Sequence, residues 1–236
     1  MQQYAARGVH GQTVEVLAER IMSGKLAEGA TLDIAALQEE FDVSLTVLRE
    51  ALKVLAAKGM VDARPKRGTF VRPRADWSLL DADVLRWQFA RPSRPSLFED
   101  LHELRSIVEP GAASLAAARA TDEDLGALDA ALTAMADAGA DPAAAVTADL
   151  AFHRALLAAT HNELLLRMEI LIETGLAERD RMVHGAQGST SPVPSHKAVV
   201  EAIRRHNPTQ AAQAMRKLLQ KAIEDVAKLA GDEEHS

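Results

Sequence analysis

The sequence contains no cysteine and few aromatic residues: one Tyr, two Trp and five Phe among 236 residues. The absence of cysteine excludes disulfides and thiolate metal sites and is compatible with a reducing cytoplasm, where we expect the protein to reside. No apolar stretch approaches the roughly 18 residues that would suggest a membrane span, so we expect no membrane partner. The first residues also lack the apolar run of a secretory signal.

Alanine and leucine dominate instead, within a hydrophobic content of 47%. These residues favour helices, while the β-branched and aromatic residues that strands favour are scarce, so the composition predicts a mainly α protein. Residues 1–75 hold 11 Lys and Arg against 9 Asp and Glu, a net charge of +2, while residues 76–236 hold 16 against 25, a net charge of −9. This uneven division indicates two domains with different partners.

Residues 12–59 carry three helical patterns separated by short breaks. Apolar residues at helical spacing mark the first two helices, and a tight turn at Asp42 and Val43 follows the second. Ser44 is a suitable N-cap for the third helix, which Gly59 ends. Two short extended pieces, 60–64 and 69–73, then flank a turn. Residues 1–75 are therefore predicted to form a winged helix-turn-helix of three helices and a β-hairpin.

The turn of this hairpin lies in "RPKRGTFVRPR", residues 64–74, which has five positive charges and no acid. A solvated surface loop is one interpretation. In a winged helix, however, the third helix enters the major groove of DNA, and cations at the tip of the hairpin attract phosphates. We therefore predict double-stranded DNA as a partner.

Residues 76–96 are predicted to form a linker with a short helix. Prolines at 73, 92 and 95 punctuate this region, and Trp77, Leu80, Val84 and Trp87 form a helical stripe. We expect the stripe to pack the linker helix onto a neighbouring domain.

Residues 97–236 are dense in helix signals and predict an all-α antiparallel bundle. Thr121, Asp141–Pro142, Ser195–His196 and Asn207–Pro208 mark predicted helix starts. The polar stretch 184–194 is interpreted as a connector or a lid.

One motif inside the bundle suggests metal chemistry. Asp149 and His153 are spaced i and i+4 on one helix, and His196 opens a later one. An aspartate and two histidines suit Zn²⁺, Ni²⁺ or Mn²⁺. The alternatives are an aspartate that simply bonds a buried histidine, and a metal-dependent hydrolase that uses the same three residues and needs a general base besides.

The string "ALQEEFDVSLTVLREALKVLAAKGMVDARPKRGTFV" resembles the winged-helix half of the GntR family of bacterial transcription regulators. The resemblance implies a DNA-binding regulator, not an enzyme, that binds operator DNA as a homodimer. It implies that Arg49 reads a guanine; the alternative is a helix charge paired with Glu50 or Asp42. The DNA-binding residues it implies are Ser44, Thr46, Arg49, Lys66, Arg67, Gly68 and Thr69.

Two positions depart from the family pattern. Leu45 stands where the family usually has Arg after the capping Ser, and Ala35 stands near the start of the second helix where Arg is also usual. We expect a variant operator sequence or weaker binding.

In the rear half, "LHELRSIVEPGAASLAAARAT", "ADLAFHRALLAATHN" and "HKAVVEAI" resemble the FCD ligand-binding domain of the FadR subfamily. This resemblance implies a metal held by an aspartate and three histidines. Asp149, His153 and His196 match three positions, but Leu218 replaces the expected fourth histidine, so the site is incomplete.

The same resemblance implies that Arg105 points inward and binds the carboxylate of an effector; a salt bridge to Glu109 is the alternative. The linker "WSLLDADVLRW" is similar to that of sugar-acid operon repressors of the galactonate type. The resemblance therefore implies a repressor of a carbohydrate-acid catabolic operon, with a small carboxylate such as an aldonate as its effector.

Overall fold

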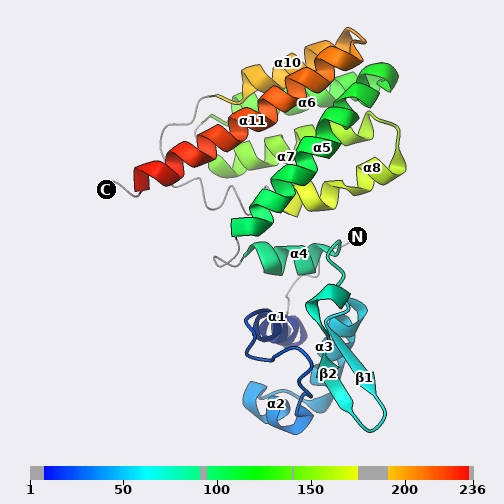
Figure 1. Ribbon diagram of the computed structural model, residues 1–236, viewed down its shortest axis with the longest axis vertical. Coiled ribbons are helices and arrows are strands. Elements are labelled where there is room, and N and C mark those ends of the chain that lie inside the picture. The colour runs from blue at the N-terminus through cyan, green and yellow to red at the C-terminus, as the bar shows by residue number, and fades with distance from the viewer. Residues whose placement is uncertain (1–7, 91–94, 140, 175–190, 234–236) are drawn as a thin grey trace. The chain divides into compact units, whose positions relative to one another are not determined.

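The computed structural model describes residues 8–90, 95–139, 141–174 and 191–233. The chain forms two compact units, residues 1–92 and residues 93–236. The first holds helices and a two-stranded hairpin, and the second is helical throughout its described elements (Figure 1). The predicted mainly α fold class is therefore confirmed. Among the described residues, no helix is both long enough and apolar enough to cross a membrane.

The first unit is a winged helix-turn-helix, as predicted. Its helices share a buried core to which α1 and α3 contribute most, including Leu17, Leu48 and Leu55. The two strands pair antiparallel, from Val61 opposite Val71 to the turn. The elements are α1 (Gly8–Met22), α2 (Ile34–Phe41), α3 (Leu45–Ala57), β1 (Val61–Arg64) and β2 (Gly68–Val71).

The linker continues the first unit through a short 3₁₀ turn (Arg74–Asp76) and helix α4 (Ala82–Phe89). Trp77, Val84 and Trp87 are buried in the same core as α1 and α3, as the stripe predicted. Leu80 is 64% exposed, so its predicted place on the stripe is wrong. Asp81 caps α4, so Leu80 lies outside the helix. The three-part division at 75 and 96 stays a prediction.

The N-terminus of α4 is fixed to the C-terminal end of α3 by a buried ion pair. The Nζ atom of Lys58 lies 2.7 Å from Oδ1 of Asp81 and 2.8 Å from Oδ2 of Asp83. Burial lowers the pKa of Lys58, but the two carboxylates outweigh it and leave the pKa raised, so the ammonium stays charged. Gly59 follows with φ +75°, and a Cβ there would lie 2.4 Å from the backbone oxygen of Asp76. The end of α3 is thus in direct contact both with the first turn of α4 and with the segment before it.

The second unit is a bundle in which α5 packs along α11, α6 along α7, and α10 against both α6 and α11. Its helix starts follow their capping residues: Thr121 and Asp124 form a capping box, and Asp141 caps the next helix. The helices are α5 (Pro95–Arg119), α6 (Asp122–Asp137), α7 (Pro142–Ala158), α8 (Glu163–Arg167), α10 (Val193–Arg204) and α11 (Pro208–Glu233).

Helix α10 begins at Val193, earlier than the predicted start at Ser195 and His196. Pro194 explains the difference, because a proline lacks the N–H that the first turn of a helix leaves unbonded, and its φ suits that turn. His196 therefore lies one turn inside the helix. Most of the stretch 184–194, interpreted as a connector or lid, lies outside the described residues.

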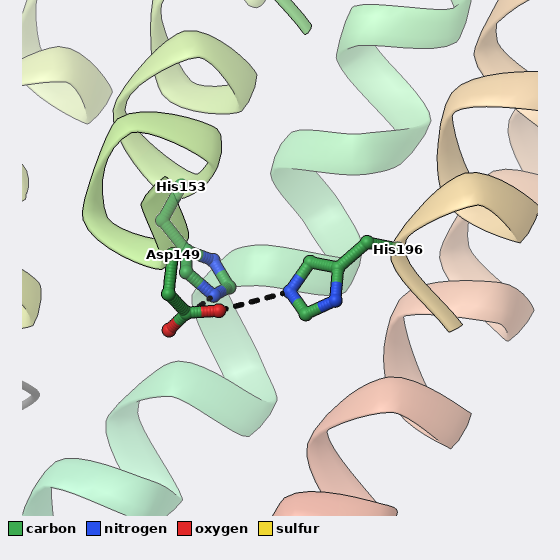
Figure 2. A group of neighbouring side chains, drawn as sticks. All are labelled: Asp149, His153 and His196. Atoms are coloured by element: carbon green, nitrogen blue, oxygen red, sulfur yellow. Dashed lines mark ion pairs between the residues drawn. The ribbon is translucent and has the colours of Figure 1, made fainter. Parts of the chain in front are cut away.

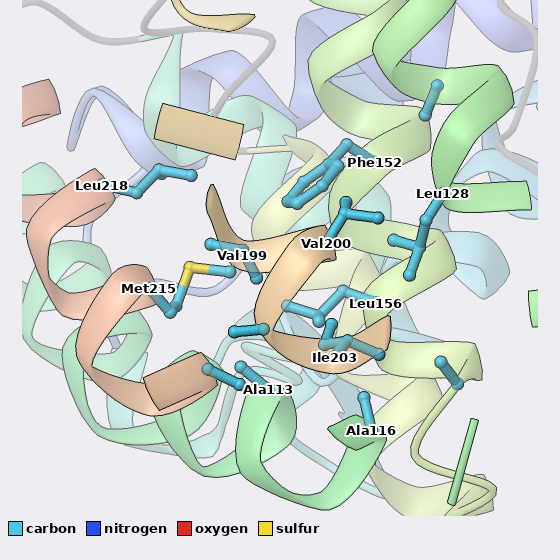
Figure 3. Close-up of a cluster of buried hydrophobic side chains, with 14 of the residues drawn as sticks. Ala113, Ala116, Leu128, Phe152, Leu156, Val199, Val200, Ile203, Met215 and Leu218 are labelled. Carbon is cyan, nitrogen blue, oxygen red and sulfur yellow. The ribbon is translucent and has the colours of Figure 1, made fainter. Parts of the chain in front are cut away.

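The main hydrophobic cluster of the bundle consists of aliphatic side chains, methionines and the ring of Phe152 (Figure 3). Leu218, from α11, belongs to this cluster and is 5% exposed. The position where the family pattern expects a fourth metal ligand is thus filled by a packed hydrocarbon side chain. Of the four ligand positions that the family pattern gives, Asp149, His153 and His196 remain.

Candidate DNA-binding surface and effector site

Helix α3 presents one polar side to solvent because its apolar residues point into the core. Ser44 has an extended backbone and accepts a hydrogen bond from the Val47 N–H at 3.3 Å, so the predicted N-cap is present. The buried face consists of Leu48, Ala51, Leu52 and Leu55. Thr46 and Arg49 are exposed on the other side, which leaves both available to a ligand.

Arg49 forms no ion pair with any residue that the structure describes. The alternative partner on its own helix, Glu50, pairs instead with Lys53 at 2.7 Å. A guanidinium without an internal partner offers two parallel N–H groups, which is the geometry that recognises O6 and N7 of guanine.

The tip of the hairpin is a tight turn closed by a hydrogen bond from the Arg67 N–H to the Arg64 carbonyl at 3.2 Å. Lys66 occupies its third position with φ +66°, a conformation that glycine or asparagine adopts more easily. The Arg67 guanidinium lies 3.5 Å from the centre of the Phe70 ring and donates to the Gly29 carbonyl at 3.0 Å. The tip therefore presents one cation in a strained backbone and one held in place by stacking.

The remaining cations of the 64–74 segment are bound inside the unit. Arg64 pairs with Asp62 at 3.3 Å, and Arg72 pairs with Asp76 at 3.1 Å. Arg74 donates to the side chain of Gln88 on α4. Only Lys66 and Arg67, among the five, have no side-chain oxygen as a partner within the described residues. The predicted contacts Lys66, Arg67, Gly68 and Thr69 thus lie together at the tip, and DNA contact by them stays a prediction.

The second unit contains a cluster of charged and imidazole side chains, most of them buried. Helix α5 supplies Arg105 and Glu109, α7 supplies Asp149 and His153, and α10 supplies His196. Arg105, Glu109, His153 and His196 are between 0% and 5% exposed. Figure 2 shows the carboxylate of Asp149 beside both imidazoles. The structure thus brings together all four rear residues that the sequence singled out.

One hydrogen bond decides which nitrogen of the His196 imidazole carries a proton. The Nδ1 atom of His196 lies 2.9 Å from the Pro192 carbonyl, which can only accept, so Nδ1 must donate. The Nε2 atom of a neutral His196 then carries a lone pair. It lies 3.0 Å from Oδ1 of Asp149, but it is buried and forms no hydrogen bond with any described residue.

A lone pair that faces a carboxylate oxygen is unfavourable unless a cation lies between them or the ring is protonated. The ligand atoms of Asp149, His153 and His196 lie within 4.8 Å of one another, close enough for one ion to contact all three. Oxygen and imidazole ligands suit Zn²⁺, Ni²⁺ or Mn²⁺. Asp149 and His196 therefore present lone pairs that fit a divalent cation, with His196 oriented by its bond to the backbone, and His153 joins them when its Nε2 is released from Arg105.

Glu109 is the residue of this cluster whose full role sequence reasoning missed. Its Oε2 lies 2.8 Å from Nδ1 of His153, and its Oε1 accepts from Nε of Arg105 at 2.5 Å. The salt bridge weighed as an alternative role for Arg105 is thus present, and the same guanidinium also places Nη2 3.0 Å from Nε2 of His153. The i, i+4 spacing of Arg105 and Glu109 indicated their pairing, but no local pattern predicted the contact between Glu109 and His153.

Arg105 and the two histidines keep both carboxylates ionised. Burial raises the pKa of Glu109, but Arg105 and His153 outweigh it and lower the pKa to about 2. Burial likewise raises the pKa of Asp149, and His153, His196 and Arg105 together hold it well below its usual range. The cluster is therefore a set of ionised carboxylates held beside a buried guanidinium and two imidazoles.

Comparison with known proteins identifies the chain. The model of the bacterial regulatory proteins of the gntR family matches residues 10–71, and the FCD domain model matches residues 100–221. The galactonate operon transcriptional repressor of Escherichia coli strain K12 is 36% identical over 205 residues, which cover 85% of this chain and 89% of that protein. The chain belongs to the GntR family. It is a ligand-responsive, DNA-binding transcription regulator with an FCD domain.

Other relatives of this GntR-family regulator are regulators as well. LutR, an HTH-type transcriptional regulator of Bacillus subtilis strain 168, is 33% identical over 83% of this chain and 90% of its own length. The solved structure of Streptococcus agalactiae GntR is 26% identical, with a TM-score of 0.51, over 90% of this chain and 98% of that one. The hydrolase alternative receives no support from these comparisons.

Proposed function

We propose that the protein represses a carbohydrate-acid catabolic operon and that a small carboxylate such as an aldonate, bound in the bundle, controls it. The observation that carries this proposal is the buried Arg105 guanidinium beside the imidazole of His153, because a buried cation in a polar cluster is suited to a small organic acid. The similarity to a galactonate operon repressor over most of both chains supports an aldonate in particular.

The acid is recognised by two kinds of group in this proposal. Arg105 supplies donors in a fixed fork to one carboxylate, and Asp149, His153 and His196 hold a divalent metal. The metal, when bound, supplies positive charge at positions that three protein ligands leave open to the oxygens of the effector. Leu218 adds no ligand on the side of α11.

In this proposal the protein acts in the cytoplasm as a homodimer, and the effector controls how the dimer binds DNA. Two winged helices, related by the dimer axis, read the two halves of a near-palindromic operator. Arg49 reads a guanine, Ser44 and Thr46 contact the DNA beside it, and Lys66, Arg67, Gly68 and Thr69 contact its backbone or minor groove. The effector changes operator affinity by no more than its differential affinity for the two arrangements of the units.

Aldonates are expected to change the mobility of the complex between the protein and its own promoter DNA, whereas fatty acids, lactate and amino acids leave it unchanged. Calorimetry of the full chain against the same panel checks binding directly. Arg105→Lys keeps the charge but loses the fork, so its aldonate affinity should fall about tenfold or more while operator binding without effector is kept. Heat released only with a fatty acyl ligand would overturn the proposed effector class.

Divalent cations are expected to raise the melting temperature of the full chain. A ligand at 100 times its dissociation constant adds about 2.7 kcal/mol, which is several degrees for a protein of this size. Zn²⁺, Ni²⁺ and Mn²⁺ should each produce a shift that Asp149→Ala removes. Asp129→Ala is the matched control, because Asp129 is an exposed acid bonded to Arg204 and its loss should leave the shift intact. Equal shifts in both variants would locate the metal elsewhere.

A further inference from the structure

The first residue of helix α3 carries an apolar side chain in solvent. Leu45 follows the capping Ser44 directly and is 37% exposed. It does not belong to the hydrophobic core of the unit, whereas Leu48 and Leu55 on the same helix are fully buried in it. Packing inside this unit therefore gives no reason for a leucine at this position.

A single exposed leucine is common on protein surfaces, so its exposure alone means little. The placement is what matters here. Leu45 and Arg49 are four residues apart, which places them on one side of the helix about 6 Å apart along its axis. The N-terminal residues of a recognition helix are those that face base edges in the major groove. Leu45 thus lies where a base-contacting side chain is expected.

The chemistry of leucine limits what it can contact there. It has no donor or acceptor, so it can neither bind a phosphate nor form a hydrogen bond with a base. In the major groove, the apolar group that a standard base presents is the C5-methyl of thymine. The neighbouring hydroxyl of Ser44 is already engaged with the Val47 N–H, so its acceptor function serves the helix.

We propose that Leu45 contacts the C5-methyl group of a thymine in the operator and so specifies a T·A pair within about two base pairs of the guanine read by Arg49. Leu45 is a specificity-determining residue in this proposal. It stands where the family pattern places an arginine after the capping serine, so an apolar contact takes the place of the hydrogen bonds that an arginine side chain can donate. The proposal rests on α3 being the helix that enters the major groove.

The test begins with sites selected from random duplex DNA by the full chain. Each thymine of the selected half-site is then replaced by deoxyuridine, which keeps base pairing and removes only the methyl group. At one position the replacement should weaken wild-type binding about fourfold per half-site, the effect of burying one methyl group, and about fifteenfold when both half-sites are changed. Leu45→Ala should weaken binding to the thymine operator and show no difference between thymine and deoxyuridine at that position.

Two control variants show whether the thymine preference belongs to Leu45. Leu80→Ala removes another exposed leucine of the same unit, outside every helix, and should keep the thymine preference. Thr46→Ser removes the neighbouring methyl group and keeps the hydroxyl. A thymine preference that persists in Leu45→Ala, or that disappears in Thr46→Ser, would overturn the proposal, and so would the absence of any thymine preference in the wild type. If Arg49→Ala also leaves operator affinity unchanged, the failure lies with the placement of α3.

Discussion

Arg49→Ala is expected to weaken binding to the operator by about two orders of magnitude or more and to leave the free energy of unfolding nearly unchanged. One bidentate contact to guanine discriminates by about 1–3 kcal/mol, and a dimer makes it twice. The fold is unaffected because Arg49 is exposed and forms no ion pair with the described residues, and exposed positions usually change stability by about 0.5 kcal/mol or less. Fluorescence anisotropy with operator and scrambled duplexes, together with denaturant unfolding, measures both quantities.

Two charge variants show whether the lost affinity is specific. Lys53→Ala removes a positive charge from the same helix, where Lys53 pairs with Glu50, so any effect should be the same for operator and scrambled DNA. Lys66→Ala at the tip of the hairpin should also weaken both DNAs alike and lower the salt dependence of binding by about one ion. An Arg49→Ala protein that holds its operator as tightly as the wild type would show that another residue reads the guanine.

The elements of this fold could be predicted where their signals lie within a few residues. Ser44, Thr121 and Asp141 each bond to an N–H two or three residues along the chain, so their capping role is visible in the sequence. The prediction was wrong where two local signals competed. At α10 the prolines set the start before the Ser195 signal, and at α4 the cap Asp81 excluded Leu80 from a stripe that the spacing alone extended to it.

The residues of the charged cluster could be predicted only in part, because only contacts within one helix leave a local pattern in the sequence. Asp149 and His153 are one turn apart on α7, so their proximity follows from helix geometry. The contact between Glu109 and His153 depends instead on how α5 packs against α7, which no short pattern encodes. His196 was singled out by residue type and the family resemblance then matched it to a ligand position; the resemblance also supplied the inward direction of Arg105, but it assigned no role to Glu109. The role of a buried acid such as Glu109 becomes clear only once the side chains around it are known.

Glu109→Leu is expected to destabilise the second unit by about 3–5 kcal/mol. Glu109 is fully buried and neutralises Arg105, which is 5% exposed, so its removal leaves a guanidinium without its carboxylate inside the bundle. It also leaves Nδ1 of His153 without its nearest carboxylate oxygen. Chemical denaturation of the full chain, followed by circular dichroism, should report the loss in the transition of the helical bundle.

The pH dependence of stability tests the role of the Glu109 carboxylate in a second way. Because Arg105 and His153 outweigh burial and lower the pKa of Glu109 from 4.5 to about 2, its ionised form stabilises the folded state above about pH 4.5. This contribution is lost as the pH falls from about 4.5 towards 2, where the folded protein also takes up the proton. The free energy of unfolding of the wild type should therefore exceed that of Glu109→Leu by an amount that shrinks as the pH falls across that window. The pH-dependent contribution of Asp149 cancels in this difference because both proteins contain it.

A double variant separates the contribution of the Arg105–Glu109 ion pair to stability from the contribution of Arg105 to aldonate binding. Replacing Arg105 with methionine together with Glu109→Leu removes both charges and leaves apolar side chains of similar volume, an exchange that is often neutral for a buried pair. Most of the stability lost in Glu109→Leu should return, whereas aldonate binding should not, because the carboxylate of the effector has lost its guanidinium. A single Glu109→Leu change that costs less than about 1 kcal/mol would mean that water reaches Arg105 in the folded bundle. A double variant that still binds aldonates would assign the recognition of the acid to the imidazoles and their metal alone.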